Sequence, residues 1–264
     1  MADVLSLFRI PKLSYRVWKV WLRNKDVFMK TYKTNFLPSL LEPILYLLAF
    51  GFGLGSFVQL INGEPYINFI APAIVCVSMM YSSFYECTYA SFVRMYFQKT
   101  FDAITATPID IEEVIVGEIL WGATRGLINS SIVLGVMVAF GLITSPLLLL
   151  IPVAAFLVGL LFAAIGMCFT AIVPNIDGFN YPAFLFITPM TLLSGTFFPI
   201  ATLPEFLQIF AQVFLPLTNA VAVTRALALG NIEASILLNL AWMLVLTPIF
   251  CILAVNLMKK RLIK

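Results

Sequence analysis

Six long apolar stretches, separated by short polar connections, dominate this sequence of 264 residues. An α-helix rises about 1.5 Å per residue, so about 20 apolar residues cross a hydrocarbon core that is roughly 30 Å thick. A helix also satisfies its own backbone hydrogen bonds inside lipid. The sequence therefore predicts an all-α polytopic membrane protein with six transmembrane helices. The predicted spans are residues 36–58, 67–93, 112–140, 147–173, 181–199 and 236–257.

The composition excludes an ordinary soluble domain. Hydrophobic residues make up 61% of the chain and charged residues 11%, whereas soluble domains average about 45–50% apolar and about 25% charged residues. The first 30 residues are basic and hold no continuous apolar run, so we expect no cleaved signal peptide. The net charge of +3 comes from residues at span ends. We therefore expect the lipid bilayer, and no nucleic acid, as a partner.

The positive charges predict the orientation of the spans. Of the 16 Lys and Arg residues, all except Arg125 and Arg225 lie in three regions: the N-terminal segment, the connection after the second span, and the C-terminal tail. Six spans place these regions on one side, which the positive-inside rule assigns to the cytoplasm. We expect both termini inside, Arg125 within a span, and Arg225 outside. Counting residues 203–229 as a seventh span would put the basic tail outside.

The N-terminal region carries a basic stripe at helical spacing. Lys12, Arg16, Lys19 and Arg23 share one face of a helix over residues 12–28, with Trp and Leu side chains on the others. Such a helix is typical of a segment that lies in the interface near anionic headgroups. The alternative is a solvated helix packed on another protein. We assign residues 1–34 to a cytoplasmic amphipathic elbow helix and residues 35–260 to the transmembrane domain.

Residues 192–227 are apolar but interrupted. Thr202 and Glu205 form a T-x-x-E pair that predicts a capping box. The helix that follows, 203–214, would be roughly 18 Å long at about 1.5 Å per residue, too short to span. The other defining positions are Gly195, Pro199, Pro204 in the first helical turn, Pro216, and Arg225 in a second short helix. We predict a re-entrant or interfacial hairpin over residues 202–229, because broken backbone at membrane depth needs cover from protein or water.

The usual catalytic and metal-binding groups are missing. The sequence contains no His and no Gly-Lys pair, which excludes His-dependent catalytic triads and an ATP-binding P-loop. Its cysteines stand in apolar runs without C-x-x-C spacing and suit a role as small buried hydrophobes; they are Cys76, Cys87, Cys168 and Cys251. We expect no enzyme activity, metal or cofactor in this chain. The remaining enzymatic alternative is a carboxylate-only site.

Charged side chains inside the predicted spans are costly in lipid and should face protein or water. They are Glu42, Glu86, Arg94, Glu118 and Arg125. One interpretation is a polar vestibule for a substrate headgroup. The other is interhelical pairing, of Arg94 with Glu42 or Glu118, and of Arg125 with Glu86.

Tyr81, Tyr85 and Tyr89 recur every four residues on one face of the second predicted span. Together with Tyr46 of the first span, they could line a path for an amphipathic or sugar-bearing substrate, with rings for stacking and hydroxyls for hydrogen bonds. The alternative is helix packing with satisfied hydroxyls. Both interpretations stay open.

The connection after the second span predicts a short helix, residues 100–107, followed by Pro108. Its residues Phe101, Asp102, Ala103, Ile104 and Thr105 form the candidate contact with a partner protein. We expect Phe101 and Ile104 to be exposed and to fill a groove on that partner. The alternative is a helix that lies on the membrane surface. Asp110 and Glu113 then predict a capping box for the third span.

Taken together, these features resemble the permease subunit of a type-2 ABC exporter, a family that includes capsule, O-antigen, teichoic-acid, lipo-oligosaccharide and drug-export permeases. The resemblance covers nearly the whole chain. Its most specific part is an S-G-x-x-F-P core at residues 194–199, followed by P-L-T at 216–218 and by Arg225. The segments EPILYLLAFGFGLGS and YFQKTFDAITATP are most similar to the branch of lipo-oligosaccharide and drug-resistance permeases.

The resemblance implies a homodimer in the bacterial cytoplasmic (inner) membrane, with each protomer docked on a separate ATP-binding subunit that binds ATP and Mg. The helix at 100–107 would be the coupling helix. The substrate would be an amphipathic or lipid-linked molecule, such as a lipo-oligosaccharide, a polysaccharide precursor or a hydrophobic drug, moving between the first, second and fifth spans. An ion-coupled secondary carrier and a non-transporting membrane scaffold are the alternatives. A carrier would show paired broken helices, whereas this sequence has one broken region.

Overall fold

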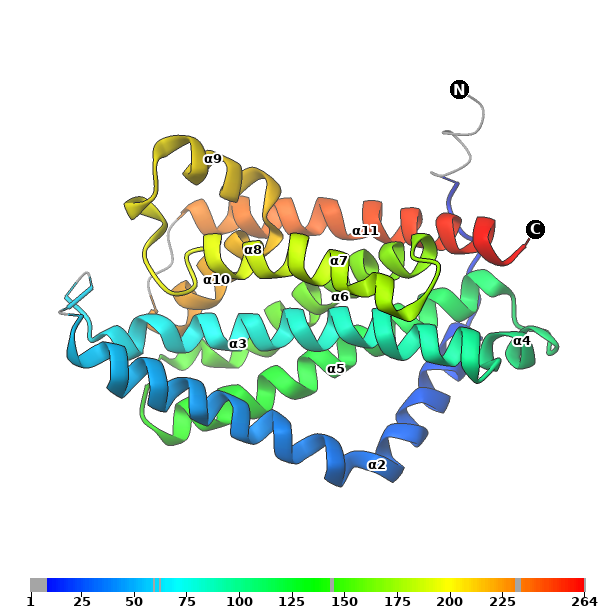
Figure 1. Ribbon diagram of the computed structural model, residues 1–264, viewed down its shortest axis with the longest axis horizontal. Coiled ribbons are helices and arrows are strands. Elements are labelled where there is room, and N and C mark those ends of the chain that lie inside the picture. Colours follow the sequence, from blue (N-terminus) through cyan, green and yellow to red (C-terminus); the bar gives the residue numbers. More distant parts are fainter. Residues whose placement is uncertain (1–8, 59, 62, 143–144, 231–233, 264) are drawn as a thin grey trace.

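The computed structural model describes residues 9–58, 60–61, 63–142, 145–230 and 234–263, without the side chains of 33–40, 42, 43 and 52. Within these residues every regular element is helical, apart from one antiparallel bridge between Ile61 and Glu64. The long helices run along a common axis (Figure 1). One end of the bundle holds the short helix α4 and the C-terminus, and we call it the α4 end. The opposite end, near α9, is the α9 end.

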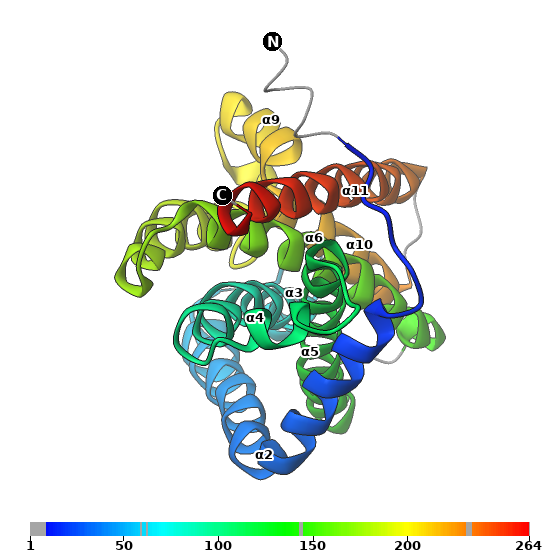
Figure 2. The same cartoon turned by 90° about the vertical axis from the view of Figure 1, so that its right-hand side faces the viewer.

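The N-terminal region differs from the prediction of a separate elbow helix. Helix α2 runs without interruption from Val17 to Tyr46, and it continues into the π-helix η2 (Leu47–Gly53) and the 3₁₀ turn η3 (Leu54–Ser56). Figures 1 and 2 show that α2 changes direction part-way along its length. Residues 12–14 are not helical, because the backbone N–H of Lys12 donates to Glu112 (2.7 Å) and that of Ser14 to Glu113 (3.2 Å).

The second and third predicted spans form as expected. Helix α3 (Tyr66–Tyr85) passes into two π-helices, η4 (Glu86–Ala90) and η5 (Val93–Phe97). After a left-handed residue at Lys99 comes α4 (Thr100–Thr105). Helix α5 (Ile111–Ala139) begins with the predicted capping box, in which the Asp110 N–H donates to Glu113 (3.0 Å).

Helices α3, α5 and α6 approach one another closely, because small residues lie between them. The fourth predicted span consists of the 3₁₀ turn η6 (Pro146–Leu150) and α6 (Ile151–Ile172). A Cβ on Gly126 would lie 3.1 Å from the Met79 carbonyl oxygen, and one on Gly166 would lie 2.9 Å from that of Phe84. Both glycines therefore let helix backbones meet at distances that a side chain would prevent.

The fifth predicted span is broken by its prolines, as expected for kinks at Pro182 and Pro189. η7 (Ile176–Phe179) precedes it, and the span itself is formed by α7 (Asn180–Pro182), the π-helix η8 (Ala183–Ile187) and α8 (Thr188–Leu193). The last predicted span is one long helix, α11 (Ala234–Leu262).

Between them lies the predicted hairpin. It contains the 3₁₀ turn η9 (Ile200–Thr202), α9 (Glu205–Phe214) and α10 (Pro216–Leu229), and the last two helices meet at 89°. The predicted capping box is wrong: Pro204 is the N-cap of α9, and the Thr202 hydroxyl donates to the Pro199 carbonyl (2.7 Å). The reason is that Thr202 closes its own 3₁₀ turn, so Glu205 begins the helix two residues later than predicted.

Four described helical segments are long and apolar enough to cross a membrane, or five if the bent pair α9–α10 counts as one. They are Tyr66–Phe97, Ile111–Ala139, Pro146–Ile172 and Ala234–Leu262. The stretches predicted as the first and fifth spans contain π and 3₁₀ turns or proline breaks. The fold is thus that of an all-helical protein with several apolar spans, and the count of six remains a prediction.

Candidate functional site

A ladder of tyrosines follows the exposed face of α3 and η4. The rings of Tyr81 and Tyr85 stack with centroids 5.6 Å apart, and those of Tyr85 and Tyr89 lie 5.7 Å apart. All three side chains are half-buried. The predicted stripe therefore exists as a continuous aromatic surface, and its polar edges remain accessible from one side.

Three adjoining cavities lie along this ladder, and together we call them the groove. The cavity nearest the α9 end has a volume of about 90 Å³. The middle one has about 610 Å³ and the one at the α4 end about 440 Å³. Neighbouring cavities share wall residues, namely Tyr46, Tyr81 and Ser82 at one junction and Glu86, Tyr89, Ala90 and Arg125 at the other. The groove thus unites every described residue of the predicted substrate path, and the Glu42 side chain lies outside the described residues.

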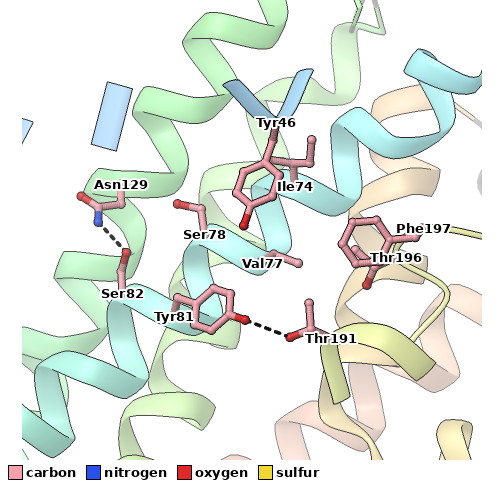
Figure 3. A pocket seen from close by; sticks show the side chains of 10 residues that line it. All are labelled: Tyr46, Ile74, Val77, Ser78, Tyr81, Ser82, Asn129, Thr191, Thr196 and Phe197. Atoms are coloured by element: carbon pink, nitrogen blue, oxygen red, sulfur yellow. Dashed lines mark hydrogen bonds between the residues drawn. The ribbon is translucent and has the colours of Figure 1, made fainter. Parts of the chain in front are cut away.

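The narrow cavity is lined by neutral hydrogen-bonding groups together with the apolar side chains of Ile74, Val77 and Phe197 (Figure 3). The Tyr81 hydroxyl lies 3.4 Å from that of Thr191, and the Asn129 amide donates to Ser82. Thr196 is completely buried in the wall, and its hydroxyl has no hydrogen-bond partner among the described residues. Such a lining suits uncharged polar groups rather than ions.

Glu86 marks the change from a neutral to a charged lining. Its carboxylate accepts hydrogen bonds from Arg94 (2.8 Å) and Trp121 (3.0 Å), and it lies 3.4 Å from the Arg125 guanidinium. Glu86 is the first residue of η4, and π-helices inside longer helices often redirect side chains at functional sites. The 3.4 Å contact confirms the predicted pair of Arg125 with Glu86.

Glu118 lies behind the groove and is completely buried. It accepts hydrogen bonds from Asn24 (2.7 Å), Ser91 (2.6 Å) and two nitrogens of Arg94 (2.9 and 2.5 Å). Of the two pairings that the sequence allowed for Arg94, the one with Glu118 is formed. Because α2, η4–η5 and α5 all contribute, this polar cluster joins three helical segments at the α4 end.

Phe101 does not have the predicted exposure. Its side chain is 1% exposed and packs in a cluster that includes Phe92 and Val114. The helical phase explains this difference: a six-residue helix that lies against α5 must turn one face inward, and Phe101 is its largest apolar residue. Asp102, Ala103 and Thr105 are exposed and Ile104 is half-buried. The outer face of α4 is therefore small and polar, and Phe101 anchors it.

The hairpin is attached to the bundle through Arg225. Its guanidinium donates to the carbonyl of Gly195 (2.9 Å) and to that of Phe69 (3.3 Å), and it lies 3.8 Å from the Phe69 ring centroid. Gly195 has a φ of +69°, a conformation that favours glycine. Pro199 precedes η9 and Pro216 begins α10. The positions that defined the predicted hairpin thus make its turns and its attachment to α3.

Several wall residues were not predicted as part of a site. They are Arg23, Asn24, Phe28, Trp121, Asn129, Thr191 and Thr196. The basic stripe included Arg23, but as a residue facing lipid headgroups. Asn129, a polar residue within the apolar third span, was the signal that could have identified part of this wall, whereas Asn24 stands in a charged run and gave none.

The sequence profile of the family described as ABC-2 type transporter matches residues 15–229. Nodulation protein J of Rhizobium meliloti is 35% identical over 229 residues, which cover 86% of each chain. Nodulation protein J of Sinorhizobium fredii is 32% identical over 245 residues, covering 92% of this chain and 93% of the relative. The inner membrane transport permease YadH of Escherichia coli is 24% identical over 189 residues, covering 72% and 73%. The chain therefore belongs to the ABC-2 type transporter family, as a multi-pass permease of the inner membrane in an ATP-driven exporter.

Proposed function

We propose that this permease moves an amphipathic or lipid-linked substrate along the groove between α2, α3 and α5, where α8 adds Thr191 to the wall at the α9 end. The observation that carries the proposal is the continuity of the three cavities from the charged α4 end to the neutral α9 end. A substrate with polar and apolar parts would meet stacking rings along the whole ladder. Lipo-oligosaccharides, polysaccharide precursors and hydrophobic drugs all have this character.

The α4 end faces the cytoplasm in this proposal, and the chain spans the membrane six times with both termini inside. Lys259 of α11 pairs with Glu112 at the start of α5 (2.5 Å), which places the basic tail at the α4 end. Positive charge at this end supports the orientation, because positive residues favour the cytoplasmic side. The hairpin α9–α10 then lies at the outer side. The exposed apolar side chains of α9 suit contact with lipid at the interface; they are Phe206, Ile209, Phe210, Val213 and Phe214.

ATP hydrolysis takes place in a separate ATP-binding subunit, which would bind ATP and Mg and dock on the exposed face of α4. Two protomers and two such subunits form the working exporter. The support for α4 is its position, because it connects η5, which carries the charged end of the groove, with α5. A displacement of α4 would therefore act directly on Arg94 and Glu118.

Transport by proteoliposomes that contain the permease and its ATP-binding subunit tests the groove. Tyr85 contacts both neighbouring tyrosines, so Tyr85→Ala should lower the transport rate severalfold while the complex still assembles. Tyr96→Ala is the matched control, because Tyr96 lies on the same helical segment, is 54% exposed and lies outside the groove. Equal transport by both variants and the wild type would refute the proposed path.

A further inference from the structure

The cavity at the α4 end holds more positive than negative charge. The guanidinium groups of Arg23, Arg94 and Arg125 line it. They face only the carboxylate of Glu86 in the wall and that of Glu118 directly behind it. Among the described residues, this end of the groove therefore carries one positive charge in excess.

Carboxylates of the protein itself neutralise the charge of two of the three arginines. Arg94 lies between both carboxylates, 2.8 Å from Glu86 and 2.5 Å from Glu118. Arg125 lies 3.4 Å from Glu86 and 4.5 Å from the ring centroid of Phe28. These contacts fix both guanidinium groups against the walls, so the excess charge belongs to Arg23.

The hydrogen-bond partners of Arg23 within the described part of the chain are neutral, and Glu118, the carboxylate that attracts it, is already paired with Arg94. Arg23 donates to the side chain of Asn24 (2.8 Å) and lies 3.5 Å from the Thr100 hydroxyl. Its side chain is only partly exposed at the mouth of a cavity of about 440 Å³. A half-buried cation is costly without a counter-charge. An arginine in this position has donors in the geometry that suits a phosphate group.

The side chains around Arg23 also indicate the chemical character of the rest of the ligand. Phe28, Trp121 and Tyr89 contribute aromatic surface beside Arg23. The cavity then continues past Arg125 to the tyrosine ladder. A small free anion would leave this aromatic surface unused, whereas a molecule with an anionic head and an apolar body would cover both.

We propose that Arg23 is the principal ligand for the phosphate headgroup of an anionic amphipathic molecule, which binds in the cavity at the α4 end with its apolar part along Tyr89 and Tyr85. This binding site rests on the proposed function only for its place at the cytoplasmic side. Because Thr100 is the first residue of α4 and lies beside Arg23, a bound headgroup also touches the start of the helix that we assign to ATPase contact.

Lipid binding to the purified permease alone tests the site, so that the result does not depend on export. The protein is exchanged into nanodiscs of phosphatidylcholine, and phosphatidic acid with the same acyl chains is titrated in. Native mass spectrometry then counts the lipids that remain bound. We expect phosphatidic acid to be retained and Arg23→Gln to weaken its binding about tenfold or more, the effect of losing a charge-assisted hydrogen bond.

Lys19→Gln is the matched control, because Lys19 is exposed, lies one helical turn earlier and does not line the cavity. It should bind like the wild type, and Arg23→Lys should recover part of the affinity. Equal binding by Arg23→Gln and the wild type, or equal retention of phosphatidylcholine, would overturn the proposal. So would full displacement by millimolar inorganic phosphate, since that result would indicate an ion site without a contribution from the apolar part.

Proteoliposomes that contain the permease and the ATP-binding subunit then show whether the bound lipid is transported cargo or a resident lipid. Outward movement of fluorescent phosphatidic acid with ATP identifies the anionic lipid as cargo. Retention without movement identifies it as a resident lipid of the permease. Both results support the site, and a permease that binds the lipid but supports no transport of any substrate would contradict the proposed function while leaving the site intact.

Discussion

Arg94 Nη2 lies 2.5 Å from Oε2 of Glu118, whose side chain is completely buried where α2 and the η4–η5 segment pack on α5. The same carboxylate accepts hydrogen bonds from Asn24 of α2 and Ser91. This pair therefore connects the three segments that surround the charged end of the groove. Removing Glu118 would leave Arg94 with Glu86 as its remaining carboxylate partner, and removing Arg94 would leave the buried charge of Glu118 without its ion pair.

Glu118→Gln should consequently destabilise the permease by about 3–5 kcal/mol, the usual cost of breaking a buried ion pair. Thermal unfolding of the detergent-purified protein measures this change. The double variant Arg94→Met, Glu118→Leu should recover part of the loss, because it removes both charges. Glu205→Gln, at the exposed start of α9, is the control, and an equal loss in this control would contradict the assigned role of the pair.

Substitutions of Phe101 and Ala103 should affect different properties, stability for Phe101 and ATPase binding for Ala103, although the two residues are only two positions apart on α4. Phe101→Ala empties a fully buried site and should cost about 3–5 kcal/mol of stability. Ala103→Asp places a charge on the exposed face and should leave the unfolding temperature unchanged while it weakens ATPase binding. Unfolding curves and co-purification of the two variants check this. Retained stability in Phe101→Ala would show that the residue is not an anchor.

Gly195 should be the most sensitive glycine of the hairpin connection. Its φ of +69° disfavours any residue with a Cβ, so Gly195→Ala should cost about 1–2 kcal/mol. It should also disturb the carbonyl that accepts from Arg225. Gly53→Ala is the control, because a Cβ there meets nothing within 4 Å. Thermal unfolding distinguishes the two variants, and equal midpoints would contradict a strained turn at Gly195.

Patterns that repeat along the chain predicted much of this fold. The apolar runs gave α3, α5, α6 and α11 within a few residues, since long continuous hydrophobicity admits few structures in a membrane. The capping box at Asp110 was identified correctly, since Glu113 keeps one oxygen for the Asp110 N–H while its other oxygen accepts from Ser14. The same pattern failed at Thr202, whose hydroxyl donates to the Pro199 carbonyl.

Features that depend on packing between distant segments were not predictable in the same way. The start of α2 is set by Glu112 and Glu113, about 100 residues away. The inward turn of Phe101 depends on where α4 lies against α5. The sequence named Glu118 as a possible partner of Arg94 but missed Glu86, because only packing decides which carboxylates lie within reach. The sequence predicts that Arg23 faces lipid headgroups, and only the packing of α2 places it beside the groove.

In the function that we propose, a separate ATP-binding subunit seated on the exposed face of α4 drives this permease. The most direct measurement is co-expression of the chain with a candidate ATP-binding subunit, followed by purification through a tag on the permease. We predict one ATP-binding subunit per permease, and loss of this subunit with Ala103→Asp at unchanged permease stability. A stable permease that purifies without the ATPase, or an Ala103→Asp variant that retains it fully, would contradict the account.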